Sequence, residues 1–145
     1  SLTGSDGVLA VIEKLAPDRI GHGIAAARSE EAMRKLCERG IVLELCPTSN
    51  VHTAAAGVTS LADHPIALLA DCGFAVTINT DNRLMSETSL SQEFLHLATA
   101  FGWDLDDMRW ATINAMKSAF LPFDDRLHLI NRVIKPGYAM LGADG

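Results

Sequence analysis

The sequence lacks the segments that would place a chain in or across a membrane. It contains no apolar run of the roughly 18 residues that a transmembrane helix needs. Its first residues carry neither the basic n-region nor the apolar h-region of a secretory signal. Lysine and arginine do not cluster, and the net charge of −6 argues against a nucleic-acid partner. With 48% apolar residues, the composition indicates a soluble globular chain without membrane or nucleic-acid partners.

The sequence contains few cysteines, and their spacing does not indicate pairs. The three cysteines are Cys37, Cys46 and Cys72, and no two of them form a C-x-x-C pair. Each lies among apolar neighbours, and the number is odd, so we expect no disulfide framework. A reducing compartment suits such thiols, and we therefore expect the protein to be cytoplasmic.

The apolar pattern predicts alternating strands and helices. Predicted strands cover 19–24, 41–45 and 74–79, and a helix precedes each of them. Ser29 is expected to begin the second helix and Gly40 to end it. Repeats of strand, loop, helix, glycine and strand are typical of βα units with a parallel sheet. Helical periodicity alone follows the third strand; the predicted helices are 90–101, 104–119 with Asp104 as its cap, and 124–134 ended by Pro136 with Val133 and Ile134 inward.

Three parallel strands leave two open sheet edges, each a row of unpaired backbone donors and acceptors. A closed (β/α)8 barrel usually needs about 250 residues, and this chain has 145. The chain also begins without Met, within an alternating pattern. The pattern is therefore compatible with a small open α/β sheet or with the final portion of a larger barrel.

Polar residues follow each predicted strand, where parallel α/β proteins gather their functional groups. His22 lies between two glycines after the first strand; it is either a hydrogen-bonded core histidine or a general base or electrostatic group near neutral pH. The loop 48–52 follows the second strand. Asp81 and Asn82 follow the third, and Asp81 is either a helix cap or a metal ligand or acid/base group.

The other polar residues in the pattern carry structural predictions. Glu44 alternates with the apolar residues of the second strand, so we expect it to form an ion pair with a neighbouring helix. Four histidines lie on loops or helices at no metal-ligand spacing, and we expect them to be surface or capping residues: His52, His64, His96 and His128.

The residues of three motifs together resemble those of a known protein family. RIGHG, then LELCPTSN, then VTINTDN, in this order and spacing, resemble the adenosine deaminase family of zinc-dependent purine aminohydrolases. The tail NAMKSAFLPFDDRL is similar to the helices that follow the last strand in that family, so the resemblance covers essentially the whole chain. It implies that residues 1–145 form a single partial domain. That domain would be the C-terminal part of a (β/α)8 TIM barrel, with strands six to eight plus the terminal helices.

The resemblance also implies roles for residues at matching positions. Asp81 would be a zinc ligand, and His22 would orient the zinc-bound water and help to deprotonate it. Asn82 would contact N7 of the purine, although the family more often has a second aspartate there. Residues 48–50 would shape the strand end without taking part in the chemistry. Glu87 departs from the family pattern, in which a small residue such as glycine is expected after Ser86.

The implied activity is zinc-dependent hydrolytic deamination of adenosine and deoxyadenosine to inosine and deoxyinosine, with release of ammonia. The family's remaining zinc ligands are a His-x-His near the first strand and a His in the fifth strand, and its proton donor is a Glu shortly after that fifth-strand His. This sequence contains no His-x-His, and nothing before His22 matches a His-Ala-Gly-Glu motif. We therefore expect a catalytically incomplete chain that requires the N-terminal part of the barrel. The alternatives are a related deaminase of adenine, a modified nucleoside or AMP, and a non-enzymatic small α/β module.

Overall fold

The computed structural model describes residues 4–143 and contains the parallel sheet that the sequence predicts. The strands are β1 (Arg19–Gly21), β2 (Val42–Leu45) and β3 (Val76–Ile78), in the order β1-β2-β3. Both neighbouring pairs are parallel. The three predicted strands are confirmed, but each is shorter than expected: β1 ends before His22, β2 begins after Ile41, and β3 begins after Ala75 and ends before Asn79.

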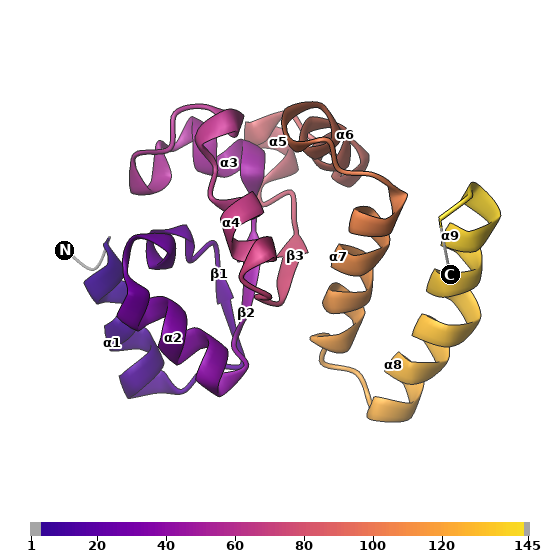
Figure 1. The fold of residues 1–145 in the computed structure, drawn as a ribbon, viewed down its shortest axis with the longest axis horizontal. Helices are drawn as coiled ribbons and strands as arrows, with labels where there is room; N and C mark the ends of the chain where they lie inside the picture. Colours follow the sequence, from indigo (N-terminus) through magenta and orange to yellow (C-terminus); the bar gives the residue numbers. More distant parts are fainter. Residues whose placement is uncertain (1–3, 144–145) are drawn as a thin grey trace.

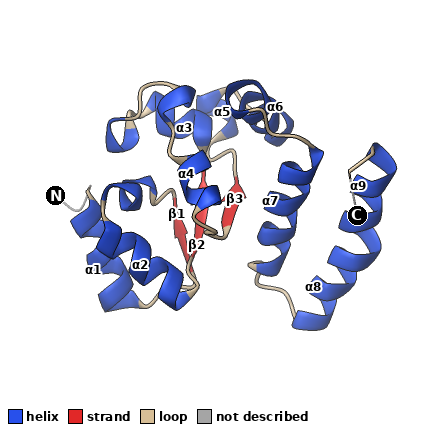
Figure 2. Ribbon diagram, in the orientation of Figure 1, coloured by secondary structure: helices blue, strands red, loops and turns tan. Residues whose placement is uncertain are grey.

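Helices make up most of the remaining chain (Figure 2). Their bounds, with 3-10 helices and one π-helix written η, are α1 (Ser5–Leu15), η1 (Ile24–Arg28), α2 (Glu30–Arg39), α3 (Pro47–His52), η2 (Ala55–Gly57), η3 (Leu61–Asp63), α4 (Ile66–Asp71), α5 (Arg83–Ser86), α6 (Leu90–Phe101), α7 (Leu105–Lys117), α8 (Phe123–Leu129), η4 (Ile130–Ile134) and α9 (Lys135–Leu141). The Ser29 hydroxyl caps α2, Gly40 ends it in the left-handed conformation, and Asp104 forms a capping box on α7. These three predicted boundaries are confirmed.

The helices lie around the sheet. In Figure 1, α1 and α2 lie together on the β1 side of the sheet, α7 runs beside β3, and α8 to α9 return antiparallel along α7. The core between these layers is fully buried at Ile12, Leu36, Leu43, Leu45 and Val76. Burial of these side chains, each stabilising by roughly 1.5–3 kcal/mol, holds the sheet against its helices.

The two outer edges of the sheet have no strand partner within residues 4–143. Along β3, every second residue forms its backbone hydrogen bonds with β2. Val76 lies between two such residues, so its carbonyl points away from β2, toward the open edge of the sheet. The Asn114 side chain on α7 donates to that carbonyl at 3.3 Å. Helix α7 therefore satisfies part of the open edge that three strands alone would leave.

Two helical predictions are corrected by the structure. Residues 47–52 form helix α3 rather than a loop, because Pro47 occupies the first turn, where its missing N–H costs nothing. The last helix does not end before Pro136. A π-helical turn over Ile130–Ile134 precedes Pro136, which lies in the first turn of α9, so the helical path continues to Leu141. Val133 is 55% exposed and does not face inward.

The cysteines are free, as expected. Only Cys46 is buried, whereas Cys37 and Cys72 are exposed, so the prediction of apolar surroundings is wrong for these two. Cys37 lies on the exposed face of α2 and Cys72 follows the last residue of α4, and an apolar neighbour in sequence does not place a residue on the buried face. Among residues 4–143, no helix combines the length and apolar character that a bilayer crossing requires.

Candidate functional site

The polar residues after the three strands meet at one end of the sheet. The Nε2 atom of His22 lies 3.7 Å from the Oδ2 atom of Asp81. The Ser49 hydroxyl on α3 donates to the same Oδ2 atom at 2.7 Å. His22 follows β1, Ser49 follows β2, and Asp81 follows β3, so three successive strand ends contribute to one cluster. The predicted convergence of His22 and Asp81 is present in the structure.

His22 and Asp81 share an unusual backbone conformation. Their φ angles are 60° and 54°, in the left-handed region that residues other than glycine rarely adopt. The His22 amide also donates to the Glu44 carbonyl at 2.8 Å, which ties the turn to the end of β2. Such backbone strain persists only where surrounding structure enforces it, and it concentrates at functional sites.

Only one of the glycines that flank His22 is required by its surroundings. Gly23 has a φ of 69°, and a Cβ atom there would lie 2.8 Å from a methyl group of Leu43. At Gly21 a Cβ would make only an ordinary contact with Glu44. The close packing of Gly23 is thus against the sheet, and this glycine allows His22 to turn out of the strand.

Asn50 connects His22 with a second histidine. Asn50 is completely buried, and its Nδ2 atom donates to the Nδ1 atom of His22 at 2.8 Å. The Oδ1 atom of Asn50 lies 3.1 Å from the Nε2 atom of His64 and 3.4 Å from the Cys46 amide nitrogen. Asn50 thus uses both ends of its side-chain amide inside the protein. Asn50 therefore contacts His22 and His64 as well as the end of β2.

His64 is 3% exposed, so the prediction of a surface residue is wrong. The capping alternative fits, because its Nδ1 atom accepts a hydrogen bond from the Ile66 amide at the start of α4 at 3.2 Å. Burial lowers the pKa of His64 to about 4, so the imidazole is neutral near pH 7. Its sequence position before a proline carries no periodicity that would reveal burial. The structure agrees with the prediction for His52 and His128, which are exposed.

Asn82, and not Asp81, caps the helix after β3. Its Oδ1 atom accepts hydrogen bonds from the amides of Leu84 and Met85, both at 3.1 Å. This excludes the cap alternative for Asp81, whose carboxylate is directed toward Ser49 and His22 instead. Since Oδ1 is committed to α5, the Nδ2 group of Asn82 is the part of this exposed side chain that can donate to a ligand.

Two acidic residues near the site have structural roles. Glu44 pairs with Arg19 at 3.2 Å, so its partner lies on β1 and not on a helix as predicted. Arg19 lies on the neighbouring strand, two residues before the register partner of Glu44. Glu93 is completely buried, although sequence reasoning did not single it out. Its carboxylate accepts from the Thr88 hydroxyl at 2.7 Å and the Thr48 amide at 3.1 Å, and so joins α6 to α3.

The donor set fits part of a zinc site. Carboxylate and imidazole are both zinc ligands, and the Ser49 hydroxyl supplies the outer hydrogen bond that usually orients a ligating carboxylate. Burial, aided by the charge of Asp81, raises the pKa of the Cys46 thiol to about 12, so it is not a thiolate near pH 7. Within residues 4–143 no group of three or more His, Cys, Asp or Glu could hold a metal ion. These residues therefore match one ligand and its surroundings rather than a complete site.

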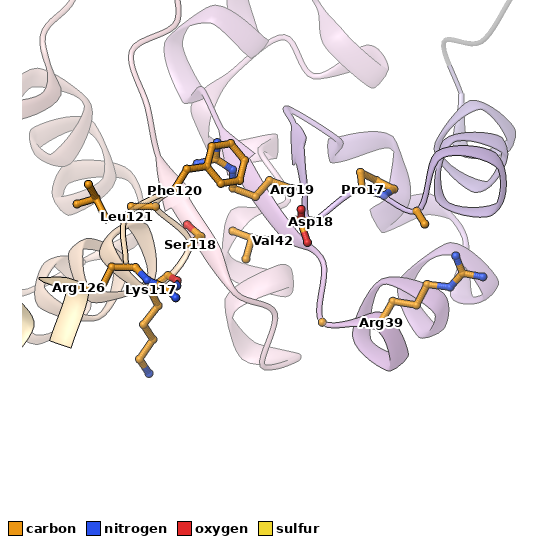
Figure 3. A pocket seen from close by; sticks show the side chains of 13 residues that line it. Pro17, Asp18, Arg19, Arg39, Val42, Lys117, Ser118, Phe120, Leu121 and Arg126 are labelled. Carbon is orange, nitrogen blue, oxygen red and sulfur yellow. The ribbon is translucent and has the colours of Figure 1, made fainter. Parts of the chain in front are cut away.

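A pocket of about 680 Å³ lies at the opposite end of the strands (Figure 3). Asp18 and Arg19 at the start of β1 line it, together with Arg39 and the α7–α8 connection. Arg19 stacks on Phe120 with 3.9 Å to the ring centre, and Arg39 donates to the Ile12 carbonyl. These arginines are engaged with the protein itself, and the pocket contains none of the predicted site residues.

Comparison with known proteins gives a consistent set of relatives. The family model described as adenosine deaminase matches residues 1–136. A Streptomyces coelicolor protein named adenosine deaminase 1 is 53% identical over 138 residues, which cover 88% of this chain and 34% of that protein. The chain thus spans about a third of the length of the curated relatives that it matches.

Two solved structures share the fold. An adenine deaminase from Arthrobacter aurescens superimposes with a TM-score of 0.85 at 23% identity, covering 92% of this chain and 40% of that one. An amidohydrolase from Burkholderia ambifaria with bound zinc gives a TM-score of 0.82 at 22% identity, covering 95% and 38% respectively. These neighbours are TIM-barrel enzymes, and the α/β arrangement of this chain, with its small parallel sheet, matches part of their fold.

Proposed function

The chain belongs to the adenosine deaminase family, and from this premise we propose that the complete protein deaminates adenosine and deoxyadenosine by hydrolysis. The products are inosine or deoxyinosine and ammonia. The observation that carries the proposal is the meeting of His22, Ser49 and Asp81 at the ends of three successive parallel strands. The identity of 53% to a protein named adenosine deaminase 1 supports the same reaction.

Within that protein, residues 1–145 form one partial domain, the C-terminal part of a (β/α)8 barrel. We assign β1, β2 and β3 to barrel strands six, seven and eight, with α6 to α9 as the terminal helices. The parallel order of the strands and the chain's coverage of about a third of its relatives support this assignment. The missing strands would pair with the outer edges of β1 and β3 and supply the other zinc ligands. The free thiols of Cys37, Cys46 and Cys72 suit a cytoplasmic location.

Asp81 would hold the zinc ion in this proposal. When bound, zinc supplies a water of lowered pKa as the nucleophile for C6 of the purine. Ser49 fixes the Oδ2 atom of Asp81 by donating to it, which leaves Oδ1 as the freer oxygen of the carboxylate. The Nε2 atom of His22 faces the same region and stabilises the attacking oxygen.

Asn82 would orient the purine. Its Nδ2 group donates to N7, which is an acceptor in the neutral base, while its Oδ1 atom remains bonded to α5. An amide donates without needing a proton from solvent, as a carboxyl group would. Because N7 is present in adenine as well as in its nucleosides, this contact selects a purine without selecting a sugar.

Because the contact between Asn82 and N7 does not involve a sugar, it is also compatible with a second class of substrate. The fold is shared with an adenine deaminase, so adenine, a modified nucleoside or AMP are the alternative substrates. Steady-state rates of the complete protein with adenosine, deoxyadenosine, adenine and AMP, read from ammonia release, decide between them. We expect the highest kcat/KM with the two nucleosides and loss of activity in Asp81→Ala. A preference for adenine or AMP would overturn the nucleoside assignment.

A further inference from the structure

We propose that His64 is a positioning residue that acts through Asn50 to hold the proton of His22 on its Nε2 atom. The proposal rests on the proposed function only in taking His22 as part of the active site. The three side chains form one continuous row of hydrogen bonds from α4 through α3 to the end of β1. Each bond in the row determines the direction of the next.

The row begins at the backbone of α4. The Ile66 amide donates to the Nδ1 atom of His64 at 3.2 Å, so this nitrogen is an acceptor and carries no proton. A neutral imidazole has one N–H group, which in His64 must therefore lie on Nε2. The neutral state follows from burial, which lowers the pKa of this residue to about 4. The backbone thus selects one tautomer of His64.

The second step fixes the side-chain amide of Asn50. The Nε2–H group of His64 donates to the Oδ1 atom of Asn50 at 3.1 Å. The Cys46 amide N–H is directed at the same oxygen at 3.4 Å. A flipped amide would place its NH2 group against both of these donors. Because Asn50 is completely buried, bulk solvent cannot replace the lost hydrogen bonds, and the orientation with Oδ1 toward His64 is favoured.

The third step determines the tautomer of His22. The NH2 group of Asn50 faces the Nδ1 atom of His22 at 2.8 Å, and an amide nitrogen only donates. Nδ1 is therefore an acceptor, and the ring proton lies on Nε2. The Nε2 atom lies 3.7 Å from the Oδ2 atom of the Asp81 carboxylate.

The tautomer of His22 determines which residue of the active site donates a hydrogen bond and which accepts a proton. A ring whose Nε2 atom carries a proton has no lone pair there with which to accept another. His22 accordingly donates a hydrogen bond to the attacking oxygen and does not remove its proton. The Asp81 carboxylate is the acceptor that remains within this cluster. Sequence reasoning assigned part of the deprotonation to His22, and the hydrogen-bond row assigns it a donor role instead.

A matched pair of His64 variants separates this role from plain structural support. His64→Gln can place an amide donor where Nε2 lies and so keep the bond to Asn50. His64→Asn can place an acceptor where Nδ1 lies, and so keeps the helix cap on Ile66 while losing the donor. Ring 15N spectra of the complete protein at pH 7.5 report which nitrogen of His22 is protonated, and steady-state kinetics with adenosine report kcat and KM.

We expect Nε2–H at His22 in the wild type and in His64→Gln, and a mixture of tautomers in His64→Asn. We also expect kcat to fall about 10- to 100-fold in His64→Asn with KM nearly unchanged, and to recover in His64→Gln. An unchanged tautomer in His64→Asn, or equal losses in the two variants, would overturn the proposal.

Asn50→Asp provides an independent test, because a carboxylate accepts from Nδ1 and should move the His22 proton there. Persistence of Nε2–H in Asn50→Asp would also contradict the proposal.

The spectra and the choice of substrate answer separate questions. If His22 shows the expected tautomers while no nucleoside is deaminated, the proposed function fails and the positioning role stands. If adenosine is deaminated while the tautomer of His22 ignores both His64 and Asn50, the positioning role fails alone.

Discussion

Acidification from pH 7.5 to 4.5 should destabilise the folded protein through His64. This residue is buried and neutral in the folded state, where its pKa is lowered to about 4 from the ordinary 6.5. The unfolded chain therefore takes up a proton at His64 at a pH where the folded chain does not. Stability contributed by the neutral imidazole is fully present above pH 6.5 and is lost as the pH falls toward 4.

The magnitude follows from the two pKa values. Each tenfold difference in proton affinity corresponds to about 1.4 kcal/mol. The free energy of unfolding should therefore fall by about 2.5 kcal/mol at pH 4.5 on account of His64 alone. This is a large fraction of the total stability of an ordinary domain, which is about 5–15 kcal/mol.

Urea denaturation of the complete protein at several pH values measures this loss. His64→Gln is the control, because it retains a donor to Asn50 but does not titrate. Other groups titrate alike in both proteins, so the difference between the two stability curves isolates His64. We expect the curves to run in parallel above pH 6.5 and to diverge by about 2.5 kcal/mol at pH 4.5. Curves that stay parallel down to pH 4.5 would refute the assignment of His64 as a buried neutral residue.

Three further substitutions test the site and its supports. Ser49→Ala removes the donor to Asp81 and should weaken zinc binding about 10- to 100-fold in a chelator competition, whereas Ser60→Ala on an exposed turn should not. Glu87→Gly should raise the free energy of unfolding by about 1 kcal/mol, because Glu87 has a φ of 49° at the end of α5; unchanged stability would contradict this strain. Asn82→Ala should lower stability by about 1 kcal/mol and raise KM for adenosine, whereas Asn82→Ser keeps a cap oxygen and should change KM alone.

The strands and most helix boundaries could be predicted because their causes are local. Ser29 caps α2 with its own hydroxyl, and Gly40 ends that helix in a conformation that glycine adopts easily. Polar residues directly after apolar strands likewise indicated the end of the sheet where His22 and Asp81 meet. Pro136 shows the limit of such rules, because a π-helical turn ahead of it lets the helix continue.

The residues that support the site could not be found in the same way. Asn50 and His64 are 14 positions apart, and neither lies in a pattern that predicts burial. Their contact depends on how α3 and the start of α4 pack over the strand ends. Glu93 is similar, since its burial requires α6 to lie against α3 and bring the Thr48 amide to its carboxylate.

By itself the sequence determined the order of strands and helices, the family, and the identity of His22, Asp81 and Asn82 as candidate residues. These features depend on hydrophobic periodicity, helix caps and short motifs, each of which involves only a few residues that are close together in the sequence. Only the tertiary structure decided which nitrogen of His22 faces Asp81, and which residues hold it there. Hydrogen bonds act over about 3 Å in space, and packing of separate helices brings their partners together from distant parts of the chain.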